Sequence, residues 1–295
     1  MKADMVLESE GCVFITGATR GIGRATAEFL HKKGFSIAAT GRNTHLIADL
    51  ESDKMAVISC DVTDERSVLH AVEEARARFG GIAAVVNNAG YGIPAPVDAV
   101  STQEVANLFE VNVFGAHRVA RAVIPEMKRN SRGIIVNISS AAGRIVTPNL
   151  GIYSASKFAL EALSDAMRVE LRPYGVHVVL VEPGPIATSF GERSREELRR
   201  VASRLEREDP ERAKELSRFW ENGLGLLDRF RKDPHSVARV IHRALTAKRP
   251  QPRYRVTLLA WAAEVGRVLP ARITDSIFSR DDVLFRFAKS PRHSE

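Results

Sequence analysis

Two side chains that could transfer a proton together are Tyr153 and Lys157, at the ends of the stretch YSASK. A spacing of four residues places both on one face of a helix. A free phenol has a pKa of about 10, too high for ready proton exchange at neutral pH. Because a nearby ammonium group favours the phenolate, we expect Lys157 to lower the pKa of Tyr153. Such a pair also arises by chance on surface helices, so it needs support from other motifs.

A second candidate site is the stretch TGATRGIG, in which Gly17, Gly21 and Gly23 remove side chains from a turn. Glycines let the backbone approach a ligand closely, and a following helix offers free N–H groups and a positive dipole end. These properties suit a pyrophosphate. The spacing is GxxxGxG rather than the commoner GxGxxG, so the turn by itself could also be an ordinary strand-to-helix connection.

The elements that must position these residues are short apolar strands that alternate with amphipathic helices. We expect strands at 11–16, 35–40, 55–63, 82–90, 133–140 and 176–184, and helices at 22–34, 64–80 and about 153–173, with two more helical stretches before residue 133. Apolar strands separated by helices indicate a parallel sheet covered on both faces, which is a doubly wound α/β or Rossmann fold. Polar residues gather where the strands end, and such folds bind their ligands there.

The whole chain, 1–295, is predicted to be a single domain with three parts. The cofactor and catalytic core spans 11–190. Residues 191–220 carry apolar residues at helical spacing among many charges, with a break near Pro210, which predicts a helical flap over the substrate. Residues 259–295 form a C-terminal extension.

The basic excess of the chain lies near its C-terminus. Residues 221–295 hold 15 Lys and Arg against 8 Asp and Glu, in a chain with a net charge of +7. A basic tail can attract nucleic acid or an anionic membrane. No nucleic-acid-binding motif accompanies the charge, so we expect no nucleic-acid partner. Peripheral membrane contact by 259–295 is the alternative to packing of this tail on its own domain or on a partner subunit.

The remaining composition narrows the class of protein. No apolar run approaches the roughly 20 residues of a membrane span, and the N-terminus does not resemble a signal peptide, so we expect a soluble cytoplasmic protein. Cys12 and Cys60 fall in predicted strands and are expected in the core rather than in a disulfide. No histidine, cysteine or acidic cluster has the spacing of a metal site, so no metal is expected.

Five motifs occur in order: TGATRGIG, NNAG (87–90), Asn112, NISS (137–140) and YSASK (153–157). Together they closely resemble the classical short-chain dehydrogenase/reductase family over about 11–190. The resemblance implies a nicotinamide-dependent oxidoreductase on a seven-stranded sheet, with the last strand near 253–259, that pairs into a homodimer or homotetramer. The alternative is a non-catalytic dinucleotide-binding regulator on the same fold. The presence of all four residues of the family's catalytic set favours the enzyme.

By this resemblance, Tyr153 is the general acid or base, and Lys157 also holds the hydroxyls of the nicotinamide ribose. Ser140 would donate a hydrogen bond to the substrate oxygen, and Asn112 would anchor a water that resupplies the proton. Ser139 competes with Ser140 for this role. The family places its serine 13 residues before the tyrosine, which selects Ser140.

The candidate cofactor residues come from six segments. Asp61 and Val62 would contact the adenine, NNAG would form the floor, and Thr188 in EPGPIAT would reach the carboxamide. The full set is Gly17, Thr19, Arg20, Gly21, Ile22, Gly23, Arg42, Asp61, Val62, Asn88, Ala89, Gly90, Tyr153, Lys157, Pro183, Gly184, Ile186 and Thr188.

The phosphate state of the dinucleotide can be predicted from charge. The second predicted strand ends in AATGRN, without the carboxylate that accepts hydrogen bonds from the ribose of NAD. Arg42 stands there instead, and Arg20 lies in the glycine turn. Guanidinium groups can bind a 2′-phosphate bidentately, which a carboxylate would repel. We therefore expect NADP(H) to be preferred, with NAD(H) left open and solvated arginines as the alternative reading.

The candidate substrate pocket is mostly apolar, which predicts a hydrophobic carbonyl compound or secondary alcohol, such as a lipid, steroid or retinoid. Its candidate residues are Tyr91, Pro94, Ser140, Ala141, Val146, Leu150, Tyr153 and Phe190.

Overall fold

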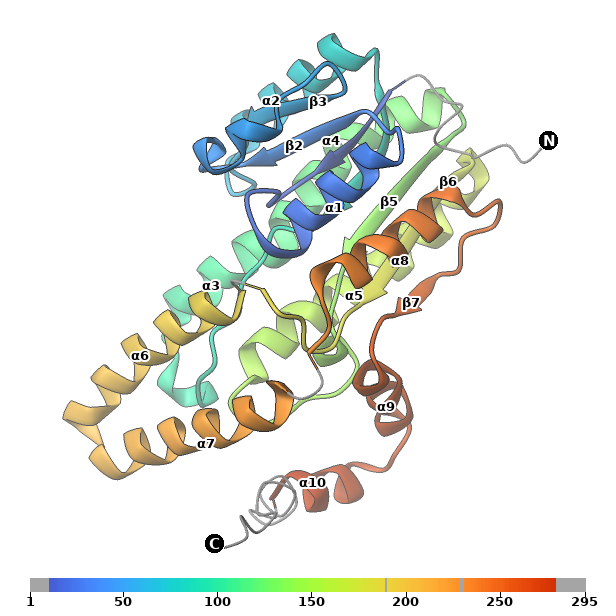
Figure 1. Ribbon diagram of the computed structural model, residues 1–295. Coiled ribbons are helices and arrows are strands. Elements are labelled where there is room, and N and C mark those ends of the chain that lie inside the picture. The colour runs from blue at the N-terminus through green and yellow to red at the C-terminus, as the bar shows by residue number, and fades with distance from the viewer. Residues whose placement is uncertain (1–10, 189, 229–230, 280–295) are drawn as a thin grey trace, which may run out of the picture.

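The protein is described by a computed structural model that covers residues 11–188, 190–228 and 231–279. Over these residues, seven parallel strands form one sheet in the order β3-β2-β1-β4-β5-β6-β7 (Figure 1). This confirms the predicted Rossmann class. The strands are β1 (Cys12–Ile15), β2 (Ile37–Gly41), β3 (Met55–Ser59), β4 (Ile82–Asn87), β5 (Gly133–Ile138), β6 (Val176–Glu182) and β7 (Arg253–Arg255).

The helices begin and end where the sequence supplies caps. Asp64 accepts a hydrogen bond from the backbone N–H of Arg66 at the start of α2, and Gly80 ends that helix in the left-handed conformation. The helices are α1 (Gly21–Lys32), α2 (Glu65–Phe79), α3 (Thr102–Phe109), α4 (Ala116–Arg129), α5 (Gly151–Leu171), α6 (Phe190–Glu208), α7 (Pro210–Asp228), α8 (Pro234–Thr246), α9 (Leu258–Arg267) and α10 (Ala271–Ser279).

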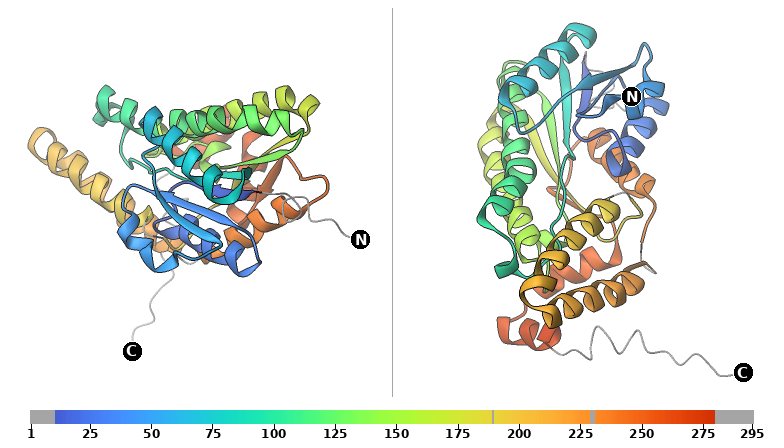
Figure 2. Two further views of the ribbon diagram at one scale, coloured as in Figure 1. Left: turned by 90° about the horizontal axis from the view of Figure 1, so that it is seen from above. Right: turned by 90° about the vertical axis from the view of Figure 1, so that its left-hand side faces the viewer.

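Helices cover both faces of the sheet, as the apolar middles of the strands predict (Figure 2). One apolar layer joins α1 and α8 to the sheet through residues such as Leu30 and Ile241. The other layer joins α2, α4 and α5 to the opposite face through residues such as Val72, Val123 and Met167. The two free cysteines, Cys12 and Cys60, are buried in this second layer, as expected for core residues.

The strands end earlier than the sequence predicts at the edge where ligands bind. Strand β3 ends at Ser59 and β4 at Asn87, so Asp61 and the last three residues of NNAG lie in loops. The expected strand 253–259 is also shortened, because the side chain of Thr257 caps the start of α9. The sequence did not reveal a π-helical turn at Glu110–Gly115 between α3 and α4.

The predicted flap is a helical hairpin, and Pro210 begins its second helix as the break near that residue predicts. Both α6 and α7 pack on α3 and on the loop after β4 through a third apolar cluster that includes Val201, Leu205 and Leu216. The hairpin lies at the carboxyl end of the sheet, as do α9 and α10 (Figures 1 and 2).

The described part of the C-terminal extension carries apolar side chains on its surface. Leu258, Trp261, Val265 and Val268 on and after α9 are exposed. Within the described residues, no helix combines the length and the apolarity that a membrane crossing needs. Membrane contact by this extension stays the untested alternative to packing on its own domain or on a partner subunit, and residues 280–295 lie outside the described part of the chain.

Candidate active site

Helix α5 brings Tyr153 and Lys157 to the carboxyl end of the sheet. Tyr153 stands in the first turn of the helix, and both side chains are buried. The ammonium group of Lys157 donates a hydrogen bond of 2.9 Å to the carbonyl oxygen of Ile138, the last residue of β5. Its Nζ atom lies 5.8 Å from the centre of the Tyr153 ring. The expected pair is therefore formed, and β5 anchors its lysine.

Ser140 is the serine that joins this pair. Its Oγ accepts a hydrogen bond of 3.1 Å from the backbone N–H of Ala142, which fixes the short helical turn that follows β5. Its hydroxyl also forms a hydrogen bond with Tyr153. The neighbouring Ser139 is buried against Gly143, where an added Cβ would lie 2.7 Å from the Ser139 Oγ. The geometry separates the two serines in the way that the motif spacing predicts.

The electrostatics of the pair differ from the sequence-based expectation. Burial raises the pKa of Tyr153 to about 12, and the hydrogen bond with Ser140 opposes this rise. Lys157 does not lower the pKa of the phenol in this arrangement, because its ammonium group is directed at Ile138 and the desolvation of the ring dominates. Burial also lowers the pKa of Lys157 to about 8. At neutral pH the phenol therefore carries its proton.

Asn112 lies in the π-helical turn, a distortion that is frequent at functional sites. Its side-chain amide donates to the carbonyl oxygen of Tyr91 at 2.9 Å and to the hydroxyl of Ser156 at 3.0 Å. Its oxygen accepts from the backbone N–H of Tyr91 at 3.0 Å. Both amide hydrogens are thus bound by protein, and the water-anchoring role of Asn112 stays a prediction.

The glycine turn has the shape of a phosphate cradle. Gly17 and Gly21 have positive φ angles of 65° and 58°, which only glycine adopts readily. A Cβ on Gly23 would lie 2.6 Å from Nδ2 of Asn88, so no side chain fits there. Helix α1 starts without a side-chain cap and without an acidic residue in its first turn. Its first N–H groups and its positive dipole end therefore suit an anion, and these residues fit a dinucleotide.

The loop after β4 is tied to this turn. The hydroxyl of Thr16 accepts hydrogen bonds from the backbone N–H groups of Asn88 and Ala89 at 3.0 and 3.1 Å. The side chain of Asn88 donates back to the carbonyl oxygens of Thr16 and Gly17. A Cβ on Gly90 would lie 3.6 Å from Nζ of Lys157. The loop therefore connects the glycine turn to the buried lysine, as a cofactor floor would.

The two arginines expected to select the cofactor are exposed beside this turn. Arg20 immediately precedes α1, and Arg42 immediately follows β2. Across the described ranges, neither guanidinium has an ion pair or a side-chain hydrogen bond. Thr19 packs closely against Gly41, because a Cβ added to Gly41 would lie 2.6 Å from Cγ2 of Thr19. Ile22 packs against the core layer beneath α1.

The other cofactor candidates border the same edge of the sheet. The Asp61 carboxylate accepts hydrogen bonds from the backbone and hydroxyl of Thr63. Val62 is buried against Gly115 of the π-helical turn. Pro183 accepts a hydrogen bond of 2.8 Å from the N–H of Ala141 and so joins the loops after β5 and β6, and Gly184 follows it. Ile186 forms an isolated parallel β-bridge with Lys232. A Cβ added to Gly21 would lie 3.2 Å from the Cβ of Thr188.

The substrate candidates are placed less uniformly. Tyr91 is buried in the apolar cluster beneath the hairpin. Leu150 is half-buried, and Val146 is 51% exposed. Phe190 begins α6, but its side chain lies outside the described residues. In the described parts of the chain, no set of three or more His, Cys, Asp or Glu is arranged to hold a metal ion.

Three residues that support the site were not assigned roles from the sequence. Thr16 ties two loops, and Ser156 accepts from Asn112 while donating to the carbonyl oxygen of Tyr153 at 2.7 Å. Glu161 is buried one helical turn beyond Lys157. The repeated spacing of four residues on α5 could have drawn attention to Glu161. The other two form tertiary contacts that no local pattern indicates.

Comparison with known proteins identifies the family. A family model described as short chain dehydrogenase matches residues 11–199. The chain therefore belongs to the short-chain dehydrogenase family, and it is an oxidoreductase that acts at a CH–OH group with a nicotinamide cofactor.

Two relatives and three solved structures illustrate this likeness. The chain is 35% identical over 267 residues to an uncharacterized oxidoreductase of Escherichia coli (strain K12), YbbO, with 90% of this chain and 93% of that protein covered. It is 37% identical over 178 residues to the 3-ketodihydrosphingosine reductase of Bacteroides thetaiotaomicron, with 60% and 65% covered.

Among solved structures, a short-chain dehydrogenase from Streptomyces avermitilis has a TM-score of 0.74 at 27% identity, with 96% of this chain and 100% of that chain covered. A 3-ketoacyl-(acyl-carrier-protein) reductase from Brucella melitensis, complexed with NADH, has a TM-score of 0.67 at 25% identity, with 83% and 96% covered. A metagenomic short-chain oxidoreductase in complex with NADP has a TM-score of 0.64 at 25% identity, with 84% and 99% covered.

Proposed function

We propose that this enzyme interconverts a hydrophobic ketone or aldehyde and its alcohol with NADP(H), and that Tyr153 is the general acid or base. The observation that carries the proposal is the group formed by half-buried Ser140 with the buried Tyr153 and Lys157, beside the glycine turn. A non-catalytic regulator would have no need for a desolvated phenol that is hydrogen-bonded to a serine.

The proposed mechanism divides the work among these side chains. A bound nicotinamide supplies or accepts the hydride. Ser140 donates its hydrogen bond to the substrate oxygen and holds it near the phenol. Because the raised pKa keeps Tyr153 protonated at neutral pH, the phenol is ready to protonate the alkoxide that reduction produces. Lys157, whose ammonium group is held by the carbonyl oxygen of Ile138, would hold the hydroxyls of the nicotinamide ribose when the cofactor is bound.

The central test is Tyr153→Phe, which removes the hydroxyl and keeps the ring. Cofactor binding, followed by the fluorescence of the reduced dinucleotide, should change little. Ketone reduction, followed by absorbance of the reduced cofactor, should fall by at least the 10²–10⁴-fold that general acid catalysis provides. Wild-type turnover by this variant would overturn the mechanism.

The preference for NADP(H) is supported by Arg20 and Arg42 beside the glycine turn, whose guanidinium groups have no ion pair with any residue that the structure describes. A charge-assisted hydrogen bond contributes about 1.5–3 kcal/mol, so Arg42→Asp should weaken NADPH binding by about 10–150-fold and leave NADH binding nearly unchanged. Arg249→Asp, which changes an exposed arginine just before β7, is the matched control. An unchanged preference for NADPH in Arg42→Asp would contradict this assignment.

The proposal of a hydrophobic substrate is supported by the burial of Tyr91 and by the apolar cluster that joins its loop to the hairpin. A relative named as a reductase of 3-ketodihydrosphingosine is consistent with a carbonyl on an apolar chain. A panel of ketones with increasing chain length should show kcat/KM rising with apolar length. A preference for small charged ketones would refute it.

We further propose a cytoplasmic homodimer or homotetramer that pairs through α4 and α5. Phe114, Phe158 and Val169 on or next to these helices are exposed at 45%, 39% and 64%, although large apolar side chains are usually covered. Light scattering coupled to size-exclusion chromatography should give two or four times 32.5 kDa. A monomer at micromolar concentration would contradict the pairing.

A further inference from the structure

Helix α5 carries a line of four polar residues spaced one turn apart: Tyr153, Lys157, Glu161 and Asp165. The first two belong to the proposed mechanism. Glu161 is as deeply buried as Lys157, with 4% and 5% of their surfaces exposed. A buried carboxylate is costly unless other charges compensate it, so its retention here requires an explanation.

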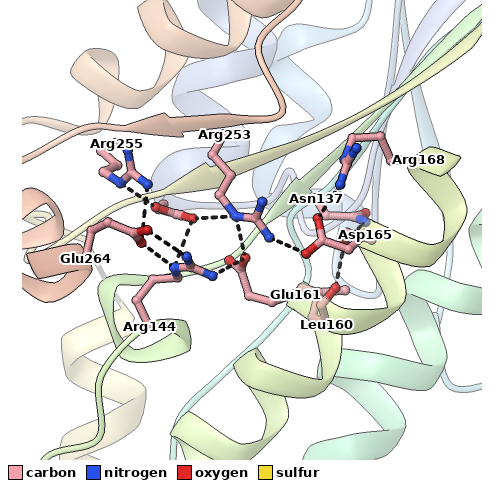
Figure 3. A network of polar contacts seen from close by, with 11 residues as sticks. Asn137, Arg144, Leu160, Glu161, Asp165, Arg168, Arg253, Arg255 and Glu264 are labelled. Carbon is pink, nitrogen blue, oxygen red and sulfur yellow. Dashed lines mark hydrogen bonds and ion pairs between the residues drawn. The ribbon is translucent and has the colours of Figure 1, made fainter. Parts of the chain in front are cut away.

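Two arginines from distant parts of the chain hold this carboxylate (Figure 3). Oε2 of Glu161 lies 3.6 Å from a terminal nitrogen of Arg144, in the turn that follows Ser140. The same oxygen lies 3.1 Å from Nε of Arg253 on β7, and Arg253 also binds Asp165 at 2.6 Å. Glu161 is thus fixed between the substrate side of the site and the last strand of the sheet.

An outer group of charges fixes the arginines in turn. Arg144 makes a bidentate pair with Glu264 of α9, at 2.6 and 2.9 Å. Glu182, at the end of β6, lies 3.3 Å from both Arg253 and Arg255. The arginines and carboxylates alternate through the cluster, so a change at one charge affects its neighbours.

Glu161 and Lys157 are both buried and pack side by side on α5. An added Cβ on Gly143 would lie 3.3 Å from both Cγ of Glu161 and Cβ of Lys157, so these groups pack around one glycine. Charges interact strongly where water is excluded. Burial lowers the pKa of Lys157 to about 8, and the negative charge of Glu161 opposes that fall.

The other groups around Lys157 do not replace this effect. Tyr153 on α5 is neutral, and β5, the π-helical turn and the loop after β4 present the Ile138 carbonyl, Asn112 and Gly90. The charged groups beyond them are those of the cluster: Arg144 from the turn after β5, Glu182 from β6 and Arg253 from β7. Among these charges, Glu161 is the one that supports the protonated lysine.

On the basis of the function proposed above, we propose that Glu161 is a positioning residue, whose carboxylate, held by Arg144 and Arg253, keeps Lys157 protonated and in place for the reaction. The C-terminal residues Arg253 and Glu264 thereby become part of the catalytic apparatus, although they lie outside the 11–199 region that matches the family model.

The test measures the protonation of Lys157 directly. The full chain is labelled with ¹³C at lysine Cε, its Lys157 signal is assigned with Lys157→Arg, and the signal is followed by NMR against pH. In Glu161→Gln the midpoint should fall by about one pH unit or more below its wild-type value. Glu170→Gln removes an exposed carboxylate from the same helix and should leave the midpoint unchanged.

Kinetics provide a second readout of the same event. The pH at which kcat/KM for ketone reduction begins to fall should move downward with the Lys157 midpoint, so that Glu161→Gln loses about tenfold more activity at pH 8 than at pH 6. A loss that is equal at every pH, with an unmoved midpoint, would show that Glu161 is only structural and would overturn the proposal.

A second variant of Glu161 and a comparison with Tyr153→Phe make the test decisive. If Glu161→Gln does not fold because two arginines lose their partner, Glu161→Asp keeps the charge but withdraws it, and it should lower the midpoint by a smaller amount. An unmoved midpoint in that variant refutes the inference. If the Lys157 midpoint does not move in the Glu161 variants while Tyr153→Phe is inactive, the role of Glu161 is refuted and the proposed function stands. If Tyr153→Phe turns over like the wild type, the proposed function itself is refuted.

Discussion

Replacing Gly23 by alanine tests whether the glycine turn is a phosphate cradle. The added Cβ would lie 2.8 Å from the carbonyl carbon of Gly17, 2.6 Å from Nδ2 of Asn88, and closer still to the Gly17 oxygen. Two of these are backbone atoms, which cannot rotate away. The φ angle of Gly23 is not in the left-handed region, so crowding alone produces the effect.

The expected magnitude follows from these contacts. Crowding of this kind costs about 1–3 kcal/mol, and displacement of Asn88 weakens its two hydrogen bonds to Thr16 and Gly17, each contributing about 0.5–1.5 kcal/mol. The protein should therefore stay folded at 25 °C with a lower melting temperature. The crowding should also move the turn away from a bound phosphate. If one charge-assisted hydrogen bond is lost, NADPH binding should weaken by about 10–150-fold.

Calorimetric titration with NADPH and thermal melting measure the two effects separately. The control is Gly34→Ala, which has a φ angle of 92° but no atom within 4 Å of the added Cβ, so it strains the backbone without crowding. Gly34→Ala should lower the melting temperature and preserve affinity. If Gly23→Ala binds NADPH within twofold of the wild type, the phosphate does not lie on this turn.

Two further predictions concern buried and paired groups. Arg144 and Arg255 lower the pKa of Glu264 to about 2. The ionised carboxylate, which is 29% exposed, should stabilise the fold by about 1–2 kcal/mol. This stabilisation should be present above pH 4.5 and lost as the pH falls toward 2. The free energy of unfolding in urea should therefore be higher for the wild type than for Glu264→Gln at pH 7, and the two should be equal at pH 2. A difference that does not change with pH would contradict this linkage. Burial raises the thiol pKa of Cys12 to about 12 and that of Cys60 to about 11, so neither should react with a disulfide reagent at pH 8 until the chain is unfolded. Rapid labelling of the folded protein would show that a thiol is accessible.

The fold could be predicted from the sequence because its signals are local. The central strands are mostly apolar, and caps such as Asp64 and Gly80 mark the helix ends. The choice of Ser140 over Ser139 also agreed with the geometry, because helix and strand spacing fix where each residue faces.

The electrostatics could not be predicted in the same way. The pKa of Tyr153 depends on how completely the ring is buried and on where the Lys157 ammonium group points, and neither is visible in the spacing of two residues. Arg144 and Glu264 are 120 residues apart in the chain and meet only after β7 turns into α9. Long-range pairs of this kind leave no periodic signal.

The hairpin of α6 and α7 rests on a third apolar cluster, which shares only the partly buried Val111 with the layers that cover the sheet in the described part of the chain. Exchanging its residues therefore leaves the sheet packing and the glycine turn untouched. Evolution, or an engineer grafting a hairpin from a relative, can exchange this part of the chain while Tyr153, Lys157 and the glycine turn are inherited intact. Under the proposed function, such modularity would let one scaffold serve different hydrophobic alcohols.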